Sequence, residues 1–256
     1  MEETKGVGSI VKTLKILDCL SKDEAEIGVT ALSQMLDIPK PTVVRLITVL
    51  QNYGYVEQNV ETKKYRLGLK LFYLGTVVLK RLEVRDKALP IMHKLKEQTG
   101  ESVYLNVVRD DKRMCLEVVR SIHDLQALIT VGQRSPLYAG ASAKVLLAFM
   151  GEAKRNKTIE KLLFTPLTAK TVTNPEKLQE ELADIREKGY ALTFGERVQG
   201  VVSVSAPIWN YSGEVLSSLS ISIPDVRADQ SKIGQTIDLL KDAAQQISSA
   251  MGYQPA

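Results

Sequence analysis

Serine residues alternate with apolar residues in two segments near the carboxy-terminal end of the chain. The segments run from 201 to 208 and from 215 to 223. Side chains of a β-strand alternate between its two faces, so the serines of each segment share one face and the apolar residues share the other. Stacked hydroxyls could line a cavity for a compact polar ligand, or they could face water. The serines are Ser203 and Ser205 in the first segment and Ser218, Ser220 and Ser222 in the second.

A second candidate for ligand chemistry is the segment 137–144, which brings small residues to a predicted helix start. The free amides at the start of a helix favour an anion such as a carboxylate. A plain helix start packed closely on a sheet is the alternative interpretation. The segment Gly140-Ala141-Ser142 also resembles half of a hydrolase nucleophile elbow, but the second glycine is missing and Lys144 is one place too close for a Ser-x-x-Lys pattern.

The outward side of a helix expected over 41–52 has residue types that suit a DNA groove. Its apolar residues Val43, Leu46, Ile47 and Leu50 are spaced by three and four and form the inward side. Arginine can contact a guanine edge through two hydrogen bonds, and threonine can reach bases or phosphates. We therefore expect contacts to DNA from one side of this helix and its start. The candidates are Lys40, Thr42, Arg45 and Thr48.

Three basic residues lie on the hairpin that is expected to follow this helix. Lys63, Lys64 and Arg66 would meet backbone phosphates, which gives affinity without sequence choice. A solvated basic turn is the alternative for each of the lysines.

No residue pattern indicates an enzyme, a cofactor or a metal site. The two histidines, His93 and His123, lie among charged residues in a predicted helix surface and a loop, so no general base stands out. Glycine-rich phosphate loops, dinucleotide fingerprints and metal-ligand spacings are absent from the sequence. Cys19 and Cys115 are far apart in apolar segments, which predicts buried free thiols.

The composition is that of an ordinary globular protein. The chain has 256 residues, 44% of them hydrophobic and 25% charged, and a net charge of +4. This charge is too small to indicate a nucleic-acid partner by itself, so that prediction depends on the motif. Apolar runs stay short of the ~20 residues that a membrane helix needs, and the start of the chain has no secretory signal pattern. The expected compartment is the cytoplasm.

The predicted helices and strands divide the chain into three parts. Residues 1–67 predict three helices, over 9–20 with Ser9 as cap, over 30–36 with Thr30 as cap, and over 41–52, followed by strands at 55–58 and 65–67. Two short helices joined by a tight turn and followed by a hairpin describe a winged helix-turn-helix. A small helical domain with an unrelated hairpin is the alternative.

A broad apolar stripe predicts one linker helix over 68–85, which could pair with its copy in a second chain or pack inside its own monomer. Residues 86–256 predict a mixed α/β domain. Its helices are expected over 88–99, 140–150, 175–188 and 229–251, and its strands over 102–109, 114–120, 125–131, 190–194, 201–208 and 215–223.

Five collinear stretches resemble the IclR family of bacterial transcriptional regulators. They are residues 9–17 (SIVKTLKIL), 36–46 (LDIPKPTVVRL), 64–68 (KYRLG), 136–144 (PLYAGASAK), and 213–215 with 220–224 (GEV and SISIP). The resemblance covers nearly the whole chain. Pro41 departs from the family, since a serine is usual there, and Thr193 and Ser203 stand where some members have Asp and Cys.

The resemblance implies an α+β protein with a winged helix-turn-helix, a linker helix and a GAF-like effector domain. It implies a homodimer or a dimer of dimers on a palindromic DNA operator, and a small organic effector that is an organic acid, a sugar acid or an aromatic compound. The ligand positions would be the amides of Ala141 and Ser142 and the side chains of Thr193, Ser203, Ser220 and Ser222. None of these residues is charged, which favours a neutral or singly anionic ligand.

The function expected from motif and resemblance together is a DNA-binding transcriptional regulator, more often a repressor, controlled by the small effector. Two alternatives remain at this point. The second domain could signal to a protein partner, with the helix-turn-helix as an interaction module, or the chain could be a serine hydrolase that uses Ser142.

Overall fold

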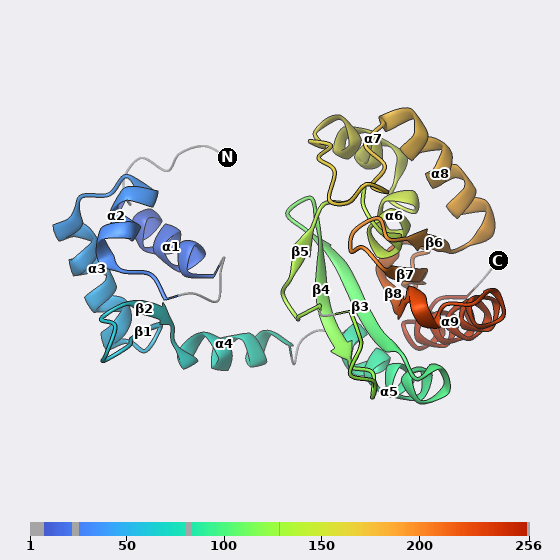
Figure 1. Cartoon of the computed structure of the whole chain (residues 1–256), viewed down its shortest axis with the longest axis horizontal. Helices are drawn as coiled ribbons and strands as arrows, with labels where there is room; N and C mark the ends of the chain where they lie inside the picture. Colours follow the sequence, from blue (N-terminus) through green and yellow to red (C-terminus); the bar gives the residue numbers. More distant parts are fainter. Residues whose placement is uncertain (1–7, 22–25, 80–82, 128, 255–256) are drawn as a thin grey trace. The chain divides into compact units, whose positions relative to one another are not determined.

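The computed structural model describes residues 8–21, 26–79, 83–127 and 129–254. The chain divides into two compact units, Met1–Arg81 and Leu82–Ala256. Each unit has its own hydrophobic core. Figure 1 shows the helices and strands of both units.

The first unit packs three helices around one small apolar core. They are α1 (Gly8–Leu20), α2 (Val29–Leu36) and α3 (Lys40–Asn52). Ile16, Leu32, Val43 and Ile47 are fully buried where the three helices meet. Asp37 ends α2 in the left-handed conformation, at φ 51°, and this allows the tight turn into α3.

A short hairpin completes this unit. Strands β1 (Val56–Gln58) and β2 (Tyr65–Leu67) pair antiparallel, and Ile27 forms an isolated bridge with Tyr65. Helix, turn, helix and hairpin therefore follow in the predicted order, which confirms the winged helix-turn-helix.

Two predicted helix caps are wrong. Ser9 lies inside α1, and its carbonyl oxygen accepts the Thr13 hydroxyl. Thr30 lies inside α2, which begins at Val29 with Gly28 at the N-cap position. The backbone bridge at Ile27 fixes the chain just before this point, so the helix starts immediately after the bridge.

The single linker helix expected over 68–85 is described as two pieces. Helix α4 covers Leu69–Leu79, and α5 covers Glu83–Thr99, earlier than the expected start at 88. Residues 80–82 of the expected helix lie outside the described residues. Helix α5 contains Pro90 in its interior.

The second unit is built on an antiparallel sheet with the strand order β5-β4-β3-β8-β7-β6. The strands are β3 (Ser102–Arg109), β4 (Lys112–Val119), β5 (Arg134–Ser135), β6 (Ala191–Phe194), β7 (Val201–Trp209) and β8 (Val215–Pro224). The long strands β3, β7 and β8 occupy central positions, so both of their faces can be covered.

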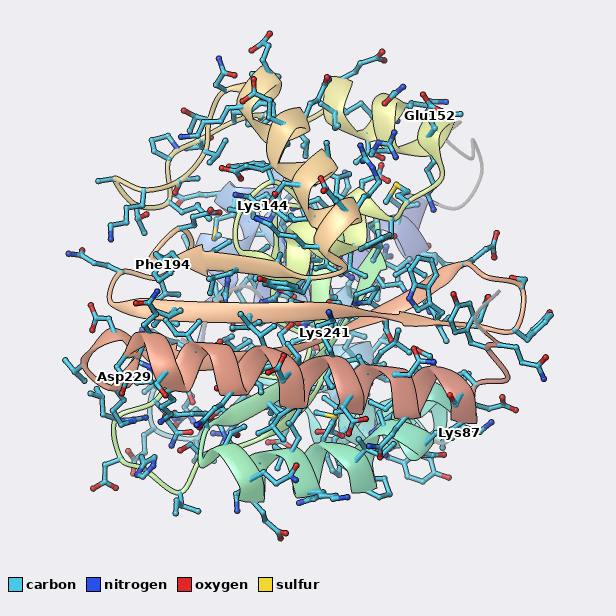
Figure 2. The ribbon with its side chains drawn as sticks, turned by 90° about the vertical axis from the view of Figure 1, so that its right-hand side faces the viewer. Lys87, Lys144, Glu152, Phe194, Asp229 and Lys241 are labelled. Carbon is cyan, nitrogen blue, oxygen red and sulfur yellow. The ribbon has the colours of Figure 1, made fainter. Side chains whose placement is uncertain are left out.

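Helices cover both faces of this sheet. Helix α9 (Gln230–Ala250) packs with α5 on one face, where Leu219, Ile221 and Ile223 of β8 are fully buried. Helix α6 (Ala141–Ala148) lies on the other face, with α8 (Pro175–Lys188) packed against it. Figure 2 shows α9 and α5 on one side of the strands and α8 and α7 (Glu152–Glu160) on the other. The predicted α+β class with a mixed second domain is confirmed.

The expected strand over 125–131 is wrong. Its described residues form bends and coil, because the carbonyl oxygens of Leu125 and Ala127 accept hydrogen bonds from the side chains of Arg227 and Tyr104. Leu128 lies outside the described residues. The short strand β5 follows instead, and α7 and the 3-10 turn η1 (Asp225–Arg227) are additional elements. Among the described residues, no helix is long and apolar enough to cross a bilayer.

Candidate functional site

The helix α3 exposes the side that the sequence analysis assigned to DNA. Val43, Leu46, Ile47 and Leu50 are buried in the core, while Lys40, Arg45 and Thr48 are exposed and Thr42 is half-buried. The Thr48 hydroxyl donates to the carbonyl oxygen of Val44 (2.9 Å), within the helix. Within the described residues Arg45 has no ion pair, so its guanidinium is free to meet a groove.

The turn between β1 and β2, residues 59–64, is called the wing turn, and a small polar network holds it in place. The Asn59 side-chain oxygen accepts the amides of Glu61 (2.9 Å) and Thr62 (3.2 Å). The Glu26 carboxylate accepts the Asn59 amide nitrogen (2.8 Å) and the Thr62 hydroxyl (2.7 Å). The hydrogen bond from Thr62, followed by that from Asn59, lowers the pKa of Glu26. A carboxylate from the segment before α2 thus fixes the shape of the turn.

The three basic residues of the wing differ in how free they are. Lys63 and Lys64 are exposed, and Lys63 has a left-handed backbone at φ 57°. Arg66 makes ion pairs with Glu57 (3.3 Å) and Glu26 (3.8 Å). A phosphate contact from Arg66 would therefore compete with partners in its own domain.

The second unit has a pocket between the sheet and the start of α6, with ≈ 410 Å³ of empty space including its opening to solvent. All six residues that the family resemblance assigned to a ligand line this one pocket. They are Ala141, Ser142, Thr193, Ser203, Ser220 and Ser222.

Paired hydroxyls form the floor of the pocket. Ser205 and Ser220 lie opposite each other on β7 and β8 with their oxygens 2.9 Å apart, and the oxygens of Ser203 and Ser222 are 3.3 Å apart. Asn106 of β3 donates its amide nitrogen to Ser220 (3.1 Å). The side-chain oxygen of Asn106 is buried without a hydrogen-bond partner among the described residues. Of the five predicted serines, Ser203, Ser220 and Ser222 line this pocket, and Ser205 and Ser218 are fully buried without lining it.

The start of α6 is already occupied by groups of the chain itself. Gly140, at φ 85°, precedes the helix and donates its amide to the Glu196 carboxylate (3.1 Å). The amide of Ala141 donates to the Thr193 hydroxyl (3.2 Å). The other oxygen of Glu196 accepts from Lys144 (2.6 Å), a residue of α6 that is 1% exposed.

Two arginines, which sequence reasoning missed, give the pocket positive charge. Arg113 is 1% exposed and lines the pocket. Its Nη1 atom donates to the carbonyl oxygen of Gln133 (3.4 Å), and its Nε atom has no partner in the described part of the chain. Burial, and then the nearby charge of Arg197, lower the pKa of Arg113 to about 10. Burial also lowers the pKa of Arg197. Both groups remain protonated at neutral pH.

Charged side chains therefore line the pocket beside the six uncharged positions that the resemblance assigns to the ligand. Arg113, Arg197 and Glu196 all line it, and their formal charges sum to +1. The sequence contains a signal for Arg113. Arg113 precedes Cys115 by two residues, so the two side chains lie on the same face of β4. The predicted strand missed Arg113 because β4 begins at Lys112, two residues before the predicted start. Arg197 and Glu196 lie in an irregular loop after β6, where no periodicity points to a face.

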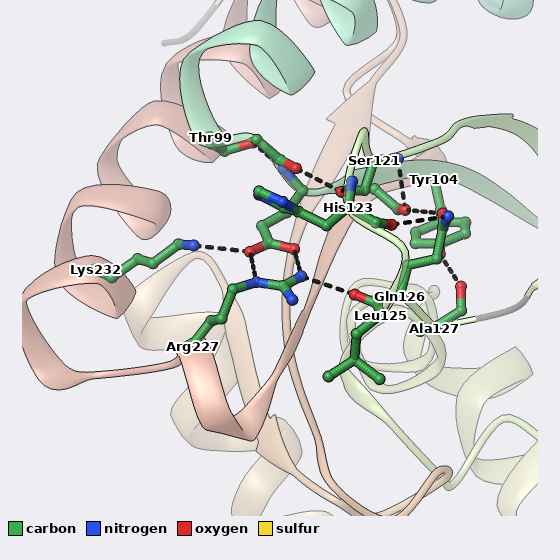
Figure 3. A network of polar contacts seen from close by, with 12 residues as sticks. Thr99, Tyr104, Ser121, His123, Leu125, Gln126, Ala127, Arg227 and Lys232 are labelled. Carbon is green, nitrogen blue, oxygen red and sulfur yellow. Dashed lines mark hydrogen bonds and ion pairs between the residues drawn. The ribbon is translucent and has the colours of Figure 1, made fainter.

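One wall of the pocket is fastened by a polar network around a buried carboxylate. Tyr104, which lines the pocket, donates its hydroxyl to Ala127 (2.6 Å) in the loop after β4. Arg227 donates to Leu125 in the same loop (2.9 Å) and to both oxygens of Glu101 (2.9 and 2.8 Å). Lys232 adds a third bond to that carboxylate (2.7 Å; Figure 3). Burial opposes ionisation of Glu101, but the bonds from Arg227 and Lys232 outweigh it and lower its pKa.

Neither hydrolytic chemistry nor metal binding is supported by this geometry. No histidine is among the residues that line the pocket, and His93 and His123 are exposed. Cys19 and Cys115 are buried free thiols, as predicted. No group of three or more metal-binding side chains occurs within the described ranges.

The chain matches two family models along most of its length. One, the IclR helix-turn-helix domain, matches residues 9–60, and the other, bacterial transcriptional regulator IclR C-terminal, matches residues 76–249. The HTH-type transcriptional regulator XynR of Escherichia coli (strain K12) is 34% identical over 96% of this chain and 98% of its own length. KdgR of the same organism is 33% identical over 98% and 95%.

Solved structures agree with these sequence matches. The IclR of Thermotoga maritima superposes with a TM-score of 0.78 at 29% identity, covering 96% of this chain and 99% of that one. An IclR homologue from Microbacterium hydrocarbonoxydans, solved with 4-hydroxybenzoate, gives a TM-score of 0.82 at 25% identity, covering 95% and 98%. These relatives are transcriptional regulators and not enzymes. With its winged helix-turn-helix and its α/β second domain, the chain belongs to the IclR family of DNA-binding bacterial transcriptional regulators.

Proposed function

We propose that this regulator is a repressor whose DNA binding is controlled by a small organic anion in the pocket beside α6. The observation that carries the proposal is the pair Arg113 and Arg197. Both line the pocket with a lowered pKa, and neither has a carboxylate partner among the described residues. Buried charges ordinarily have a partner of opposite charge, so two arginines without a carboxylate partner favour an anionic ligand.

Other lining groups narrow the chemistry of this ligand. The unpartnered oxygen of Asn106 requires a donor, and the serine hydroxyls can accept or donate. A carboxylate that also has hydroxyl groups supplies both, as in hydroxy acids, sugar acids and hydroxylated aromatic acids. The homologue from Microbacterium hydrocarbonoxydans binds 4-hydroxybenzoate, which has one carboxylate and one hydroxyl.

For the DNA interface, we propose that α3 enters the major groove and that the wing contacts phosphates. Arg45 is the candidate for base contact, because it is exposed and unpaired among the described residues. Lys40, Thr42 and Thr48 flank it on α3, and Lys63, Lys64 and Arg66 supply positive charge from the wing.

The chain acts in this proposal as a homodimer or as a dimer of dimers. Helix α4 exposes Leu69, Phe72, Leu74 and Val77, and Phe72 is 72% exposed. An exposed apolar helix face of this kind is typical of an interface with a second copy. Phe72→Glu is expected to shift the protein to a monomer in sedimentation velocity, while an unchanged dimer would remove α4 from the interface.

The effector controls DNA binding only if it prefers one arrangement of the dimer over another. A coupling of ~1–3 kcal/mol is the usual size of such a difference. The arrangement that binds the operator less well would be the one that the anion favours, as expected for a repressor released by its ligand.

The test is a thermal-shift screen with small carboxylic acids, followed by DNA binding. A ligand at 100 times its dissociation constant adds ~2.7 kcal/mol to the stability of the native state. Arg197→Met should abolish the shift without unfolding the protein. Operators selected from random duplexes by the full-length chain should then be released by the same acid. The effector proposal fails if no acid shifts the melting temperature, and the repressor proposal fails if the acid strengthens operator binding.

A further inference from the structure

Glu196 places a carboxylate at the start of α6, directly before the residues Ala141 and Ser142 that the resemblance assigns to the ligand. One of its oxygens accepts the amide of Gly140 at the start of α6 (3.1 Å), and the residue lines the pocket at 9% exposure. Backbone amides at a helix start favour a negative charge. The chain thus supplies its own anion at the end of the pocket.

The same pocket has buried polar atoms without hydrogen-bond partners among the described residues. The Nε atom of Arg113 and the side-chain oxygen of Asn106 are buried at 1% exposure, line the pocket, and lack partners in the described part of the chain. Unsatisfied buried atoms on two different strands are costly unless a ligand completes them.

Glu196 also has a second partner outside the pocket. Its other oxygen accepts from Lys144 (2.6 Å), and the ammonium of Lys144 also donates to Glu181 of α8. The backbone behind the carboxylate is anchored, because Thr168 and Thr171 donate their hydroxyls to the carbonyl of Glu196 (3.1 and 2.7 Å). The side chain can therefore leave Gly140 and keep its ion pair without any movement of the main chain.

We propose that Glu196 is an internal competitor of the effector, which occupies the start of α6 when the pocket is empty and is displaced toward Lys144 by an incoming organic anion. This inference rests on the proposed function and specifies its regulation. Only an anion that also bonds to Arg113, Arg197 and the hydroxyl floor compensates for the displacement, so simple anions bind weakly. Because Lys144 joins Glu196 to Glu181, displacement also changes the contact between α6 and α8.

The experiment compares Glu196→Gln with wild type and with the control Glu181→Gln. Both substitutions keep size and remove one negative charge from the same ion-pair network, but Glu181 does not line the pocket. Apparent dissociation constants for formate, glycolate and D-gluconate are measured by thermal-shift titration of the full chain, against sodium chloride at equal ionic strength. We expect Glu196→Gln to bind at least one of these anions about tenfold more tightly, since a nearby like charge is gone, and Glu181→Gln to stay within about twofold of wild type.

The outcomes separate the two proposals. If anions stabilise wild type and both variants equally, the competitor is refuted and the anion pocket stands. If no anion stabilises wild type or Glu196→Gln, the anionic effector and the competitor are both refuted. If the glutamine variant does not fold, Glu196→Asp replaces it. The shorter carboxylate cannot reach from Lys144 to Gly140, so the start of α6 is left open and a gain in affinity is again required, smaller than for glutamine because the negative charge stays nearby.

Discussion

Replacing Arg113 by methionine should stabilise the empty protein and abolish anion binding. Methionine fills a similar volume without a charge. The fall in the pKa of Arg113 to about 10 corresponds to about 3 kcal/mol at about 1.4 kcal/mol per pKa unit, and burial is its largest cause. A base with a lowered pKa in the folded state destabilises the fold wherever it must stay charged, which here means below about pH 10. At pH 7 the full cost applies.

The net gain is smaller than this cost, because the hydrogen bond to Gln133 (3.4 Å) is lost. We expect about 1–3 kcal/mol of stabilisation, in the range found when buried charges are replaced by apolar side chains. For a protein of this size, 1 kcal/mol moves the melting temperature by roughly 2–4 °C.

Calorimetry of the ligand-free protein at pH 7 measures this effect, with Arg134→Met as the matched control. Arg134 lies on the neighbouring strand β5, is half-exposed, and pairs with Asp110 (3.1 Å). Its loss should change stability by less than about 0.5 kcal/mol. A lower melting temperature for Arg113→Met, or retained anion binding, would refute the view of Arg113 as an uncompensated cation that awaits a ligand.

Three further predictions concern other parts of the molecule. Arg45→Ala should cost ~1–3 kcal/mol of operator binding free energy, measured by fluorescence anisotropy, with an unchanged melting temperature. Arg109→Ala, which removes another exposed arginine, should leave operator binding unchanged. Equal losses for both variants would show that Arg45 contributes only non-specific positive charge. Glu26→Gln should speed amide hydrogen exchange in the wing turn at pH 7. Because the pKa of Glu26 is lowered in the folded protein, its stabilising contribution is present above the ordinary carboxylate pKa and disappears as the pH falls through the lowered value. Wild type and variant should therefore converge at that low pH. Glu101→Gln removes a carboxylate with no exposed surface from two cations and should cost about 3–5 kcal/mol in urea unfolding, against near zero for the exposed Glu97→Gln; a small loss would show that the cations find other partners.

Local patterns predicted most elements of both units. The helices α3 and α8 and the strands β7 and β8 were placed within about two residues, because each buries one face and so repeats apolar residues at the period of its own backbone. The same logic put the serines of β7 and β8 on one face. Whether that face met water or a cavity could not be read from periodicity, since both faces of a central strand can be buried.

A predicted strand is wrong where side chains from distant parts of the chain form hydrogen bonds with the backbone of the segment. The apolar segment 125–131 resembles a strand, but Tyr104 and Arg227, from β3 and η1, bind its carbonyl oxygens. Such competition depends on residues distant in sequence, and a local pattern contains no information about it.

The winged helix-turn-helix, the outward position of Arg45 and the hydroxyl face of the second domain can all be predicted from the amino-acid sequence. These follow from short-range spacing. The charge of the pocket cannot be predicted in this way, because Arg113 comes from β4 and Arg197 and Glu196 come from the loop after β6. Charges act through space, so only the folding of these separate segments around one cavity makes their positive charge a binding site.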